Sequence, residues 1–227
     1  AYIKNPFVVG NTNPGNGQSR YFLISPINRK FFSPRNNGIT DGMFRDLIVS
    51  NAESCLLIAE FIQKGYSGSV DTKGTAEDWY KKGVASSIKT MNAVAVVANS
   101  TTGFTGNGDA EVAAYLSGAD VAFNGTNDLE RIYIQQYLNF YRNPNEAFVF
   151  SRRTGYPKNT STYYAREPFN ETIPRRWWLS DPGQVNRENW NAAMSAQNFT
   201  PNAQDVPTLN SQRIWYDKTA PEFGQGQ

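Results

Sequence analysis

The feature that most constrains this sequence is an apolar stripe between Met43 and Lys64. Small and apolar side chains recur there at spacings of three and four residues, at Phe44, Ile48, Ala52, Cys55, Ala59 and Ile62. That period places them on one face of an α-helix. Further apolar residues widen the face, so we expect this helix to be buried on more than one side.

A second amphipathic helix is predicted after a turn. Gly65 is placed to end the first helix, and Thr75 with Asp78 resembles a capping box at the start of the second. Gly83 lies on the apolar face of the second helix, where a missing side chain permits a close helix crossing. Two helices joined by a turn are typical of an antiparallel helical hairpin.

More helices are predicted in the middle of the chain. One short helix is expected over residues 110–117, and a longer one begins at Asn127 or Asp128 and is broken by Pro144. Residues 146–153 add one or two helical turns. Residues 94–97 either extend the second helix or form a short strand.

The two ends of the chain are rich in turns. Residues 1–42 contain many Gly, Pro and Asn residues, and residues 158–227 are loop-rich apart from a helix over 187–196. The tail 222–227 is expected to fray. We therefore predict a mainly α fold of helical hairpins over residues 43–157, with long irregular loops and little strand.

Composition excludes several classes of function. The chain has no histidine and one cysteine, which leaves no Ser-His-Asp unit, imidazole metal site, internal disulfide or thiolate cluster. A net charge of +2 without a basic run argues against nucleic-acid binding. Residues 106–109 hint at a cation loop but lack calcium-motif spacing, so a turn is favoured. We expect no metal and no cofactor.

Carboxylates are the remaining candidates for acid–base catalysis. Glu167 and Glu171 lie near Trp177 and Trp178, an arrangement similar to the acid pair and aromatic platform of a glycosidase. The alternative is that both carboxylates are solvated charges on an extended surface loop. We favour the second interpretation, because spacing along a loop does not determine the distance between two carboxylates.

Charged residues near the apolar helix suggest structural ion pairs. Glu53 and Glu60 lie on that helix, where a carboxylate is costly unless it is paired. Arg152 and Arg153 form one of two arginine pairs in the chain (the other is 175–176) and either bind an anionic ligand or tie loops to the helices. We favour the structural role, with at least one helix glutamate contacting an arginine.

Loop aromatics are the candidates for ligand binding. Tyr21, Phe31 and Phe32, with Arg35 and Asn36 beside them, fall in the turn-rich segment at the start of the chain. Aromatic faces stack on the apolar faces of sugars and on peptide side chains, and Arg and Asn supply hydrogen bonds. The alternative is that loop aromatics anchor their own loop to the core.

Six segments, in order along the chain, resemble proteins of the SusD/RagB type. The most specific match is the end of one segment, Arg152-Arg153-Thr154-Gly155-Tyr156-Pro157, because members of the family have the same residues in the same order. The others are Asn51-Ala52-Glu53 through Glu60 and Gly65; Trp79-Tyr80 with Gly83-Val84-Ala85-Ser86-Ser87; Ile134-Gln135-Gln136-Tyr137-Leu138; Ile173-Pro174-Arg175-Arg176; and Asn189-Trp190 with Arg213-Ile214-Trp215-Tyr216-Asp217-Lys218.

This resemblance implies a fold and a function. The fold is an α/α superhelix of tetratricopeptide-like hairpins that supports a loop-rich half. The function is non-enzymatic binding of a glycan, peptide or other nutrient at the cell surface. Family members are outer-membrane lipoproteins that deliver this ligand to a SusC-like TonB-dependent transporter. Alternatives are a carbohydrate-active hydrolase that uses Glu167 and Glu171, or a helical scaffold for protein interaction.

The chain also departs from the family pattern. Family chains are longer and begin with a signal peptide and a lipid-bearing cysteine, whereas Cys55 sits inside an apolar helix. We therefore expect residues 1–227 to be the C-terminal portion of such a lipoprotein, with membrane attachment only through a lipid anchor outside this chain. The matching motifs are scaffold positions, so Tyr21, Phe31, Phe32, Arg35 and Asn36 remain the ligand prediction.

Substitution of Glu60 tests the proposed ion pair. If Glu60 is buried and paired with Arg152 or Arg153, Glu60→Ala lowers the free energy of unfolding by about 3–5 kcal/mol, because the partner charge is left uncompensated. Urea denaturation measures this loss. A loss below about 1 kcal/mol places Glu60 on the surface, where ion pairs contribute little.

Overall fold

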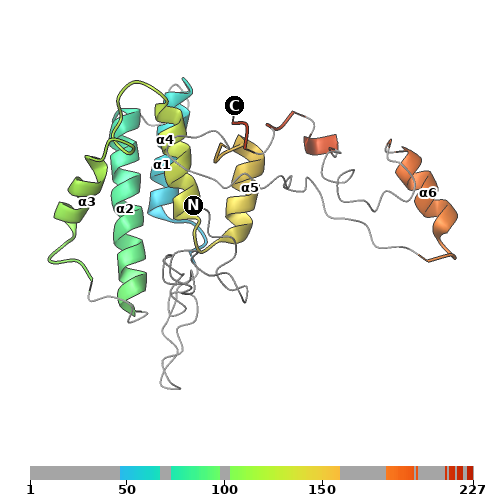
Figure 1. The fold of residues 1–227 in the computed structure, drawn as a ribbon, viewed down its shortest axis with the longest axis horizontal. Coiled ribbons are helices and arrows are strands. Elements are labelled where there is room, and N and C mark those ends of the chain that lie inside the picture. Colours follow the sequence, from blue (N-terminus) through green and yellow to red (C-terminus); the bar gives the residue numbers. More distant parts are fainter. Residues whose placement is uncertain are drawn as a thin grey trace, which may run out of the picture. The chain divides into compact units, whose positions relative to one another are not determined.

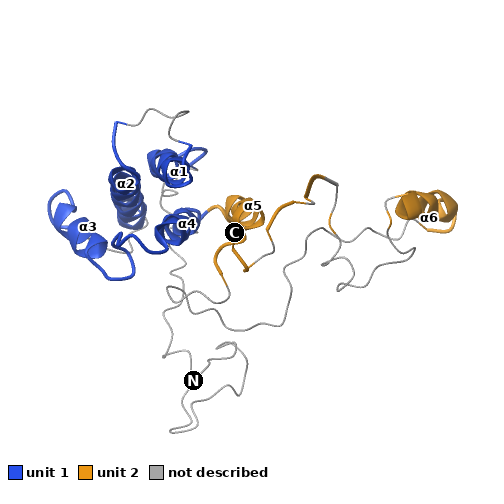
Figure 2. Cartoon of the chain, turned by 90° about the horizontal axis from the view of Figure 1, so that it is seen from above, with its two compact units in different colours: residues 1–142 blue, residues 143–227 orange. Residues whose placement is uncertain are grey.

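The computed structural model describes residues 47–66, 73–97, 103–158 and 183–196, and a few positions near the C-terminus (198, 213, 215–217, 219–221 and 224–226). All regular structure within these ranges is helical, which confirms the mainly α fold class. The chain divides into two compact units, residues 1–142 and 143–227, coloured separately in Figure 2. No described helix has the length and apolarity that crossing a bilayer requires.

Four helices form the first unit. They are α1 (Asn51–Gln63), α2 (Ala76–Val97), α3 (Asp109–Leu116) and α4 (Asp128–Asn139). Helix α1 packs against α2 and α4, and α2 also contacts α3 and α4. Figure 1 shows α1, α2 and α4 side by side, and the view along them in Figure 2 places α3 outside α2.

Ser50 determines where α1 begins. Its backbone is extended, with φ −102° and ψ 153°, and its Oγ accepts a hydrogen bond from the Glu53 N–H at 3.0 Å. This cap satisfies one of the unpaired donors of the first turn. The prediction of a helix from Met43 is therefore wrong for residues 47–50. Ile48, expected on the buried face, is 91% exposed.

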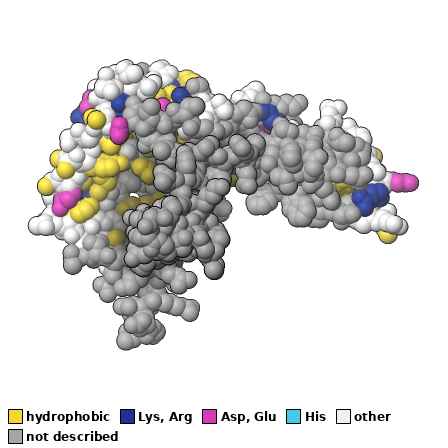
Figure 3. Space-filling model, in the orientation of Figure 1, with side chains coloured by type: hydrophobic (Ala, Val, Ile, Leu, Met, Phe, Trp, Pro, Cys, Tyr) yellow, Lys and Arg dark blue, Asp and Glu magenta, His cyan; other side chains and the backbone are white. Residues whose placement is uncertain are grey.

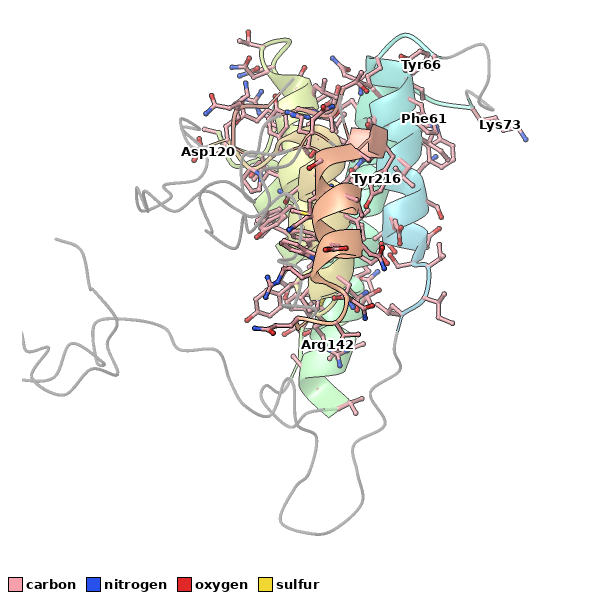
Figure 4. The ribbon with its side chains drawn as sticks, turned by 90° about the vertical axis from the view of Figure 1, so that its right-hand side faces the viewer. Phe61, Tyr66, Lys73, Asp120, Arg142 and Tyr216 are labelled. Atoms are coloured by element: carbon pink, nitrogen blue, oxygen red, sulfur yellow. The ribbon has the colours of Figure 1, made fainter. Side chains whose placement is uncertain are left out.

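The C-terminal end of α1 confirms the prediction for Gly65. Gly65 has a φ of +81°, and its N–H donates to the Ile62 carbonyl at 3.0 Å. The Tyr66 N–H donates to the Phe61 carbonyl at 2.9 Å. These two bonds define a Schellman motif, which glycine adopts without a Cβ penalty. Figure 4 shows the Phe61 and Tyr66 side chains beside this end of α1.

The predicted capping box starts α2. The Thr75 N–H and hydroxyl both donate to Asp78 Oδ2 at 2.8 Å, and the Asp78 N–H donates to Thr75 Oγ1 at 3.1 Å. Hydrogen bonds from the Thr75 backbone and side chain lower the pKa of Asp78, because they stabilise its carboxylate. At the other end, residues 94–97 extend the helix rather than forming a strand.

Gly83 sets the distance between α1 and α2. A Cβ atom on this residue would lie 2.6 Å from Leu56 Cγ and 3.2 Å from the Ala52 carbonyl oxygen. The predicted close crossing is therefore confirmed, with Leu56 lying over the glycine. The fully buried core around this contact consists of Leu56, Ala59, Tyr80, Val84 and Ile132.

Tyr80 connects α2 to the segment between α3 and α4. Its hydroxyl donates to the Val121 carbonyl at 2.8 Å, and its ring lies 4.6 Å from the Phe123 ring, centroid to centroid. Burial raises the pKa of Tyr80 well above its usual range, so the hydroxyl keeps the proton that it donates. This contact holds the chain that leads into α4 against the core.

The second unit contains α5 (Pro144–Thr154), α6 (Arg187–Ala196) and the 3₁₀ helix η4 (Trp215–Asp217). Helix α6 has the predicted bounds. Pro144 does not break α4, which ends at Asn139; it occupies the first position of α5. Proline is favoured there because the first turn needs no N–H donor and φ is already helical.

Gly83→Ala tests the close crossing. Alanine has the higher helix propensity by about 1 kcal/mol, but a side chain at this position overpacks the interface against Leu56. We expect a net loss of about 1–2 kcal/mol in the free energy of unfolding, measured with urea. Ala93→Gly on the exposed side of the same helix is the matched control and should cost about 1 kcal/mol. Stabilisation by Gly83→Ala would contradict this packing.

Cys55 reports the opening of the α1 interface. It is the single cysteine of the chain, it is 5% exposed, and burial raises the pKa of its thiol. We expect slow reaction with a thiol reagent at pH 8 and rapid reaction in urea, because the thiolate is the reactive form. The thiol keeps its proton longer in the folded chain, so Cys55 lowers stability as the pH rises above about 8.5. Fast labelling of the thiol in the folded chain would contradict the burial of Cys55. Cys55→Ala is the control for the pH dependence, because it removes the titrating thiol.

Candidate functional site

The predicted ligand-binding residues lie outside the described part of the chain. These are Tyr21, Phe31, Phe32, Arg35 and Asn36, and their role stays a prediction. The same holds for the carboxylates of the alternative hydrolase, Glu167 and Glu171.

Residues 106–109 form a turn, as predicted. The Asp109 N–H donates to Asn107 Oδ1 at 3.1 Å, and Lys89 Nζ lies 2.6 Å from Asp109 Oδ1. The Lys89 bond lowers the pKa of Asp109. The carboxylate is therefore part of an ion pair between α2 and α3. Within the described ranges, no group of three or more His, Cys, Asp or Glu residues is suited to a metal.

Glu60 is the buried carboxylate of the first unit. It is 1% exposed and faces α4, where the Tyr133 hydroxyl donates to its Oε1 at 3.2 Å and Gln136 Nε2 donates to its Oε2 at 3.0 Å. Lys64 Nζ lies 3.7 Å from Oε1. Burial of Glu60 is confirmed, and hydrogen bonds with an ion pair compensate the lost hydration.

The other predicted ion-pair residues lie in two places. Glu53 is half-buried in the first turn of α1 and makes no ion pair within the described residues. Arg152 donates to Asp217 Oδ2 at 2.8 Å, and the Arg153 guanidinium lies 5.6 Å from the centre of the Phe150 ring. Contact between a helix glutamate and Arg152 or Arg153 stays a prediction.

The motif at residues 152–157 binds the C-terminal tail through one backbone carbonyl. Gly155 has a φ of +73°, and its carbonyl accepts hydrogen bonds from the N–H groups of Gly224 at 2.9 Å and Gly226 at 3.2 Å. Tyr156, in the same turn, is 5% exposed. The expectation that the tail frays is therefore wrong for residues 224–226, because the N–H groups of Gly224 and Gly226 bind Gly155, the residue that follows α5.

A pocket opens between α2, α3 and α4, within the first unit. Its volume is about 490 Å³, and it is lined by Ser87, Ile88, Met91, Asn92, Ala95, Phe104, Tyr115, Gln135 and Leu138. Hydrophobic side chains gather on the α2 and α3 side of the molecule in Figure 3. Sequence reasoning missed this pocket, because its lining comes from residues far apart in the chain.

Three helices and the segment before α3, which supplies Phe104, line the pocket. Helix α2 supplies one wall through consecutive turns, Tyr115 comes from α3, and Gln135 and Leu138 come from α4. Gln135 Nε2 donates to the Tyr115 hydroxyl oxygen at 2.8 Å, which links α4 to α3 across the pocket. Gln135 is 8% exposed, so the neighbouring helices hold its amide in place.

Comparison with known proteins identifies the family of this chain. A solved chitin-binding protein is similar to this chain, with 28% identity and a TM-score of 0.47, over 73% of this chain and 32% of its own length. The chain thus spans about a third of that protein. No curated protein matches. The pattern of the SusD-like proteins, described as starch-binding and associating with the outer membrane, matches residues 10–178. Since this match covers most of the sequence, the chain belongs to the SusD-like family.

Proposed function

We propose that this chain is part of a cell-surface protein of the outer membrane that binds a glycan without transforming it. The observation that supports this proposal is the family match over residues 10–178, since the family is described as starch-binding and associating with the outer membrane. The same description names binding and no reaction. A nutrient-binding protein therefore fits the chain better than the alternative hydrolase.

The composition is suited to neutral sugars. Aromatic residues make up 14% of the chain, and their faces stack on the apolar faces of sugar rings. Asparagine and glutamine side chains both donate and accept hydrogen bonds, which matches sugar hydroxyl groups. The residues proposed to bind the glycan are still Tyr21, Phe31, Phe32, Arg35 and Asn36.

The proposed partner is a SusC-like TonB-dependent transporter that receives the bound nutrient. Association of the family with the outer membrane supports this partner. The proposed attachment is a lipid anchor outside residues 1–227. A transporter gene beside the gene for this protein, and co-purification of the two proteins from outer membranes, would support the pairing.

Glycan binding is tested by calorimetric titration with maltohexaose and chitohexaose, together with retention on insoluble starch. We expect saturable binding of at least one of these glycans and no new reducing ends after incubation. Removal of the proposed aromatic platform by Phe31→Ala with Phe32→Ala should weaken binding about tenfold or more.

Phe61→Ala is the control for this pair of substitutions, because Phe61 is a 40% exposed aromatic residue at the end of α1. This variant should bind as the unchanged protein does. Absence of binding to all three glycans would contradict the proposed function. Release of reducing ends would favour the hydrolase. If Phe61→Ala weakens glycan binding as much as Phe31→Ala with Phe32→Ala does, residues 31–32 are not the binding site.

A further inference from the structure

The pocket between α2, α3 and α4 has the size and lining of a small-molecule site. Its volume of about 490 Å³ falls in the range of roughly 300–1,000 Å³ that such sites occupy. The apolar part of the lining combines the Phe104 and Tyr115 rings with aliphatic side chains, and Leu138 is 47% exposed. This surface is therefore accessible and apolar enough to hold a ring by contact.

Four uncharged polar side chains belong to the same lining: Ser87, Asn92, Tyr115 and Gln135. One hydrogen bond joins them, from Gln135 Nε2 to the Tyr115 hydroxyl oxygen. In the described part of the chain, no group accepts the Tyr115 proton and none donates to Gln135 Oε1. The pocket thus offers a donor and an acceptor side by side.

No charged side chain lines the pocket. The nearest cation along α2 is Lys89, next to Ile88, and it is paired with Asp109 at 2.6 Å. A charged ligand would lose its hydration here without a partner, which disfavours it. The occupant that fits is neutral.

The unused polar groups distinguish between two neutral occupants. An apolar side chain of another protein would cover the Tyr115 hydroxyl and the Gln135 carbonyl oxygen without satisfying them, which is unfavourable. A sugar satisfies both, because each of its hydroxyl groups donates and accepts. Its C–H faces pack on aromatic rings at the same time.

We propose that this pocket is a second glycan-binding site, which takes one or two neutral sugar rings between Phe104, Tyr115 and Leu138. The class of ligand rests on the proposed function. The position does not, since it follows from the pocket and from the two polar groups of its lining that have no partner among the described residues. The site lies on the helical scaffold, away in sequence from residues 21–36.

The first experiment observes the pocket directly. The chain has three methionines, of which Met91 lines the pocket and Met194 is buried in α6. With ¹³C-methyl-labelled methionine, titration with maltohexaose or chitohexaose should shift the Met91 methyl signal with saturation. The Met194 signal should stay in place, and Met91→Leu and Met194→Leu each assign one of these two signals.

The second experiment blocks the pocket. Ala95→Trp places an indole ring among the lining residues, whereas Ala93→Trp places the same ring on an exposed position of the same helix. We expect Ala95→Trp to weaken the Met91-detected binding about tenfold or more, and Ala93→Trp to leave it unchanged. The melting temperature of each variant confirms that it is folded.

The outcomes separate this inference from the proposed function. Saturable binding by calorimetry without a Met91 shift overturns the pocket site and leaves the proposed function intact. Equal weakening by Ala93→Trp and Ala95→Trp also overturns it. If neither glycan binds in any assay, the proposed function fails as well. A Met91 shift that persists in the Phe31→Ala, Phe32→Ala variant supports a second, separate site.

Discussion

The contact between Leu56 and Gly83 determines how the rest of the first unit is arranged. A Cβ atom at residue 83 would lie 2.6 Å from Leu56 Cγ, so α1 and α2 approach each other too closely for any residue with a side chain at this position. Protein interiors are packed as densely as organic crystals, and such a contact leaves little freedom to slide. The remaining faces of both helices then have definite partners: α1 and α2 both contact α4, and α2 also contacts α3.

The second constraint is the buried carboxylate of Glu60. Its two oxygens accept from Tyr133 and Gln136, which lie three residues apart on α4 and therefore on one side of that helix. Gln136 Nε2 also donates to the Leu56 carbonyl at 3.2 Å. A one-turn slip of α4 along α1 would leave these groups unpaired inside the core, which is costly. The polar contacts therefore select one register, while the apolar core supplies most of the favourable burial.

These two constraints also explain the pocket. Because α1 occupies one side of α2 through Gly83, the side of α2 that carries Ile88 and Met91 is left for α3 and α4. The Gln135–Tyr115 hydrogen bond joins α4 to α3 there. The helices of the first unit thus form a hollow that is lined by aromatic and uncharged side chains. The motif at residues 152–157 has a different role: in the second unit its Gly155 carbonyl binds the C-terminal tail.

Local signals in the sequence determined most of the described helices. The Thr75–Asp78 capping box, the Gly65 end and the bounds of α6 follow from residues a few positions apart, and the family follows from motifs in order along the chain. Signals of this kind act within a few residues and need no tertiary contact. Ile48 and Pro144 show the limit of such signals. The apolar period at Ile48 continues beyond the Ser50 cap, where α1 begins, and Pro144 begins α5 instead of ending α4.

What only the tertiary structure decided depends on residues far apart in the chain. The partners of Glu60 lie 73 and 76 positions away, and the pocket joins α2 to Tyr115 and Gln135. No spacing rule predicts such contacts, because they depend on how helix faces rotate against one another when they pack. The sequence alone determined a mainly helical chain of the SusD-like family with a close helix crossing. Packing decided which carboxylate became buried, which groups satisfied it, and where a hollow lined by aromatic and uncharged polar side chains remained.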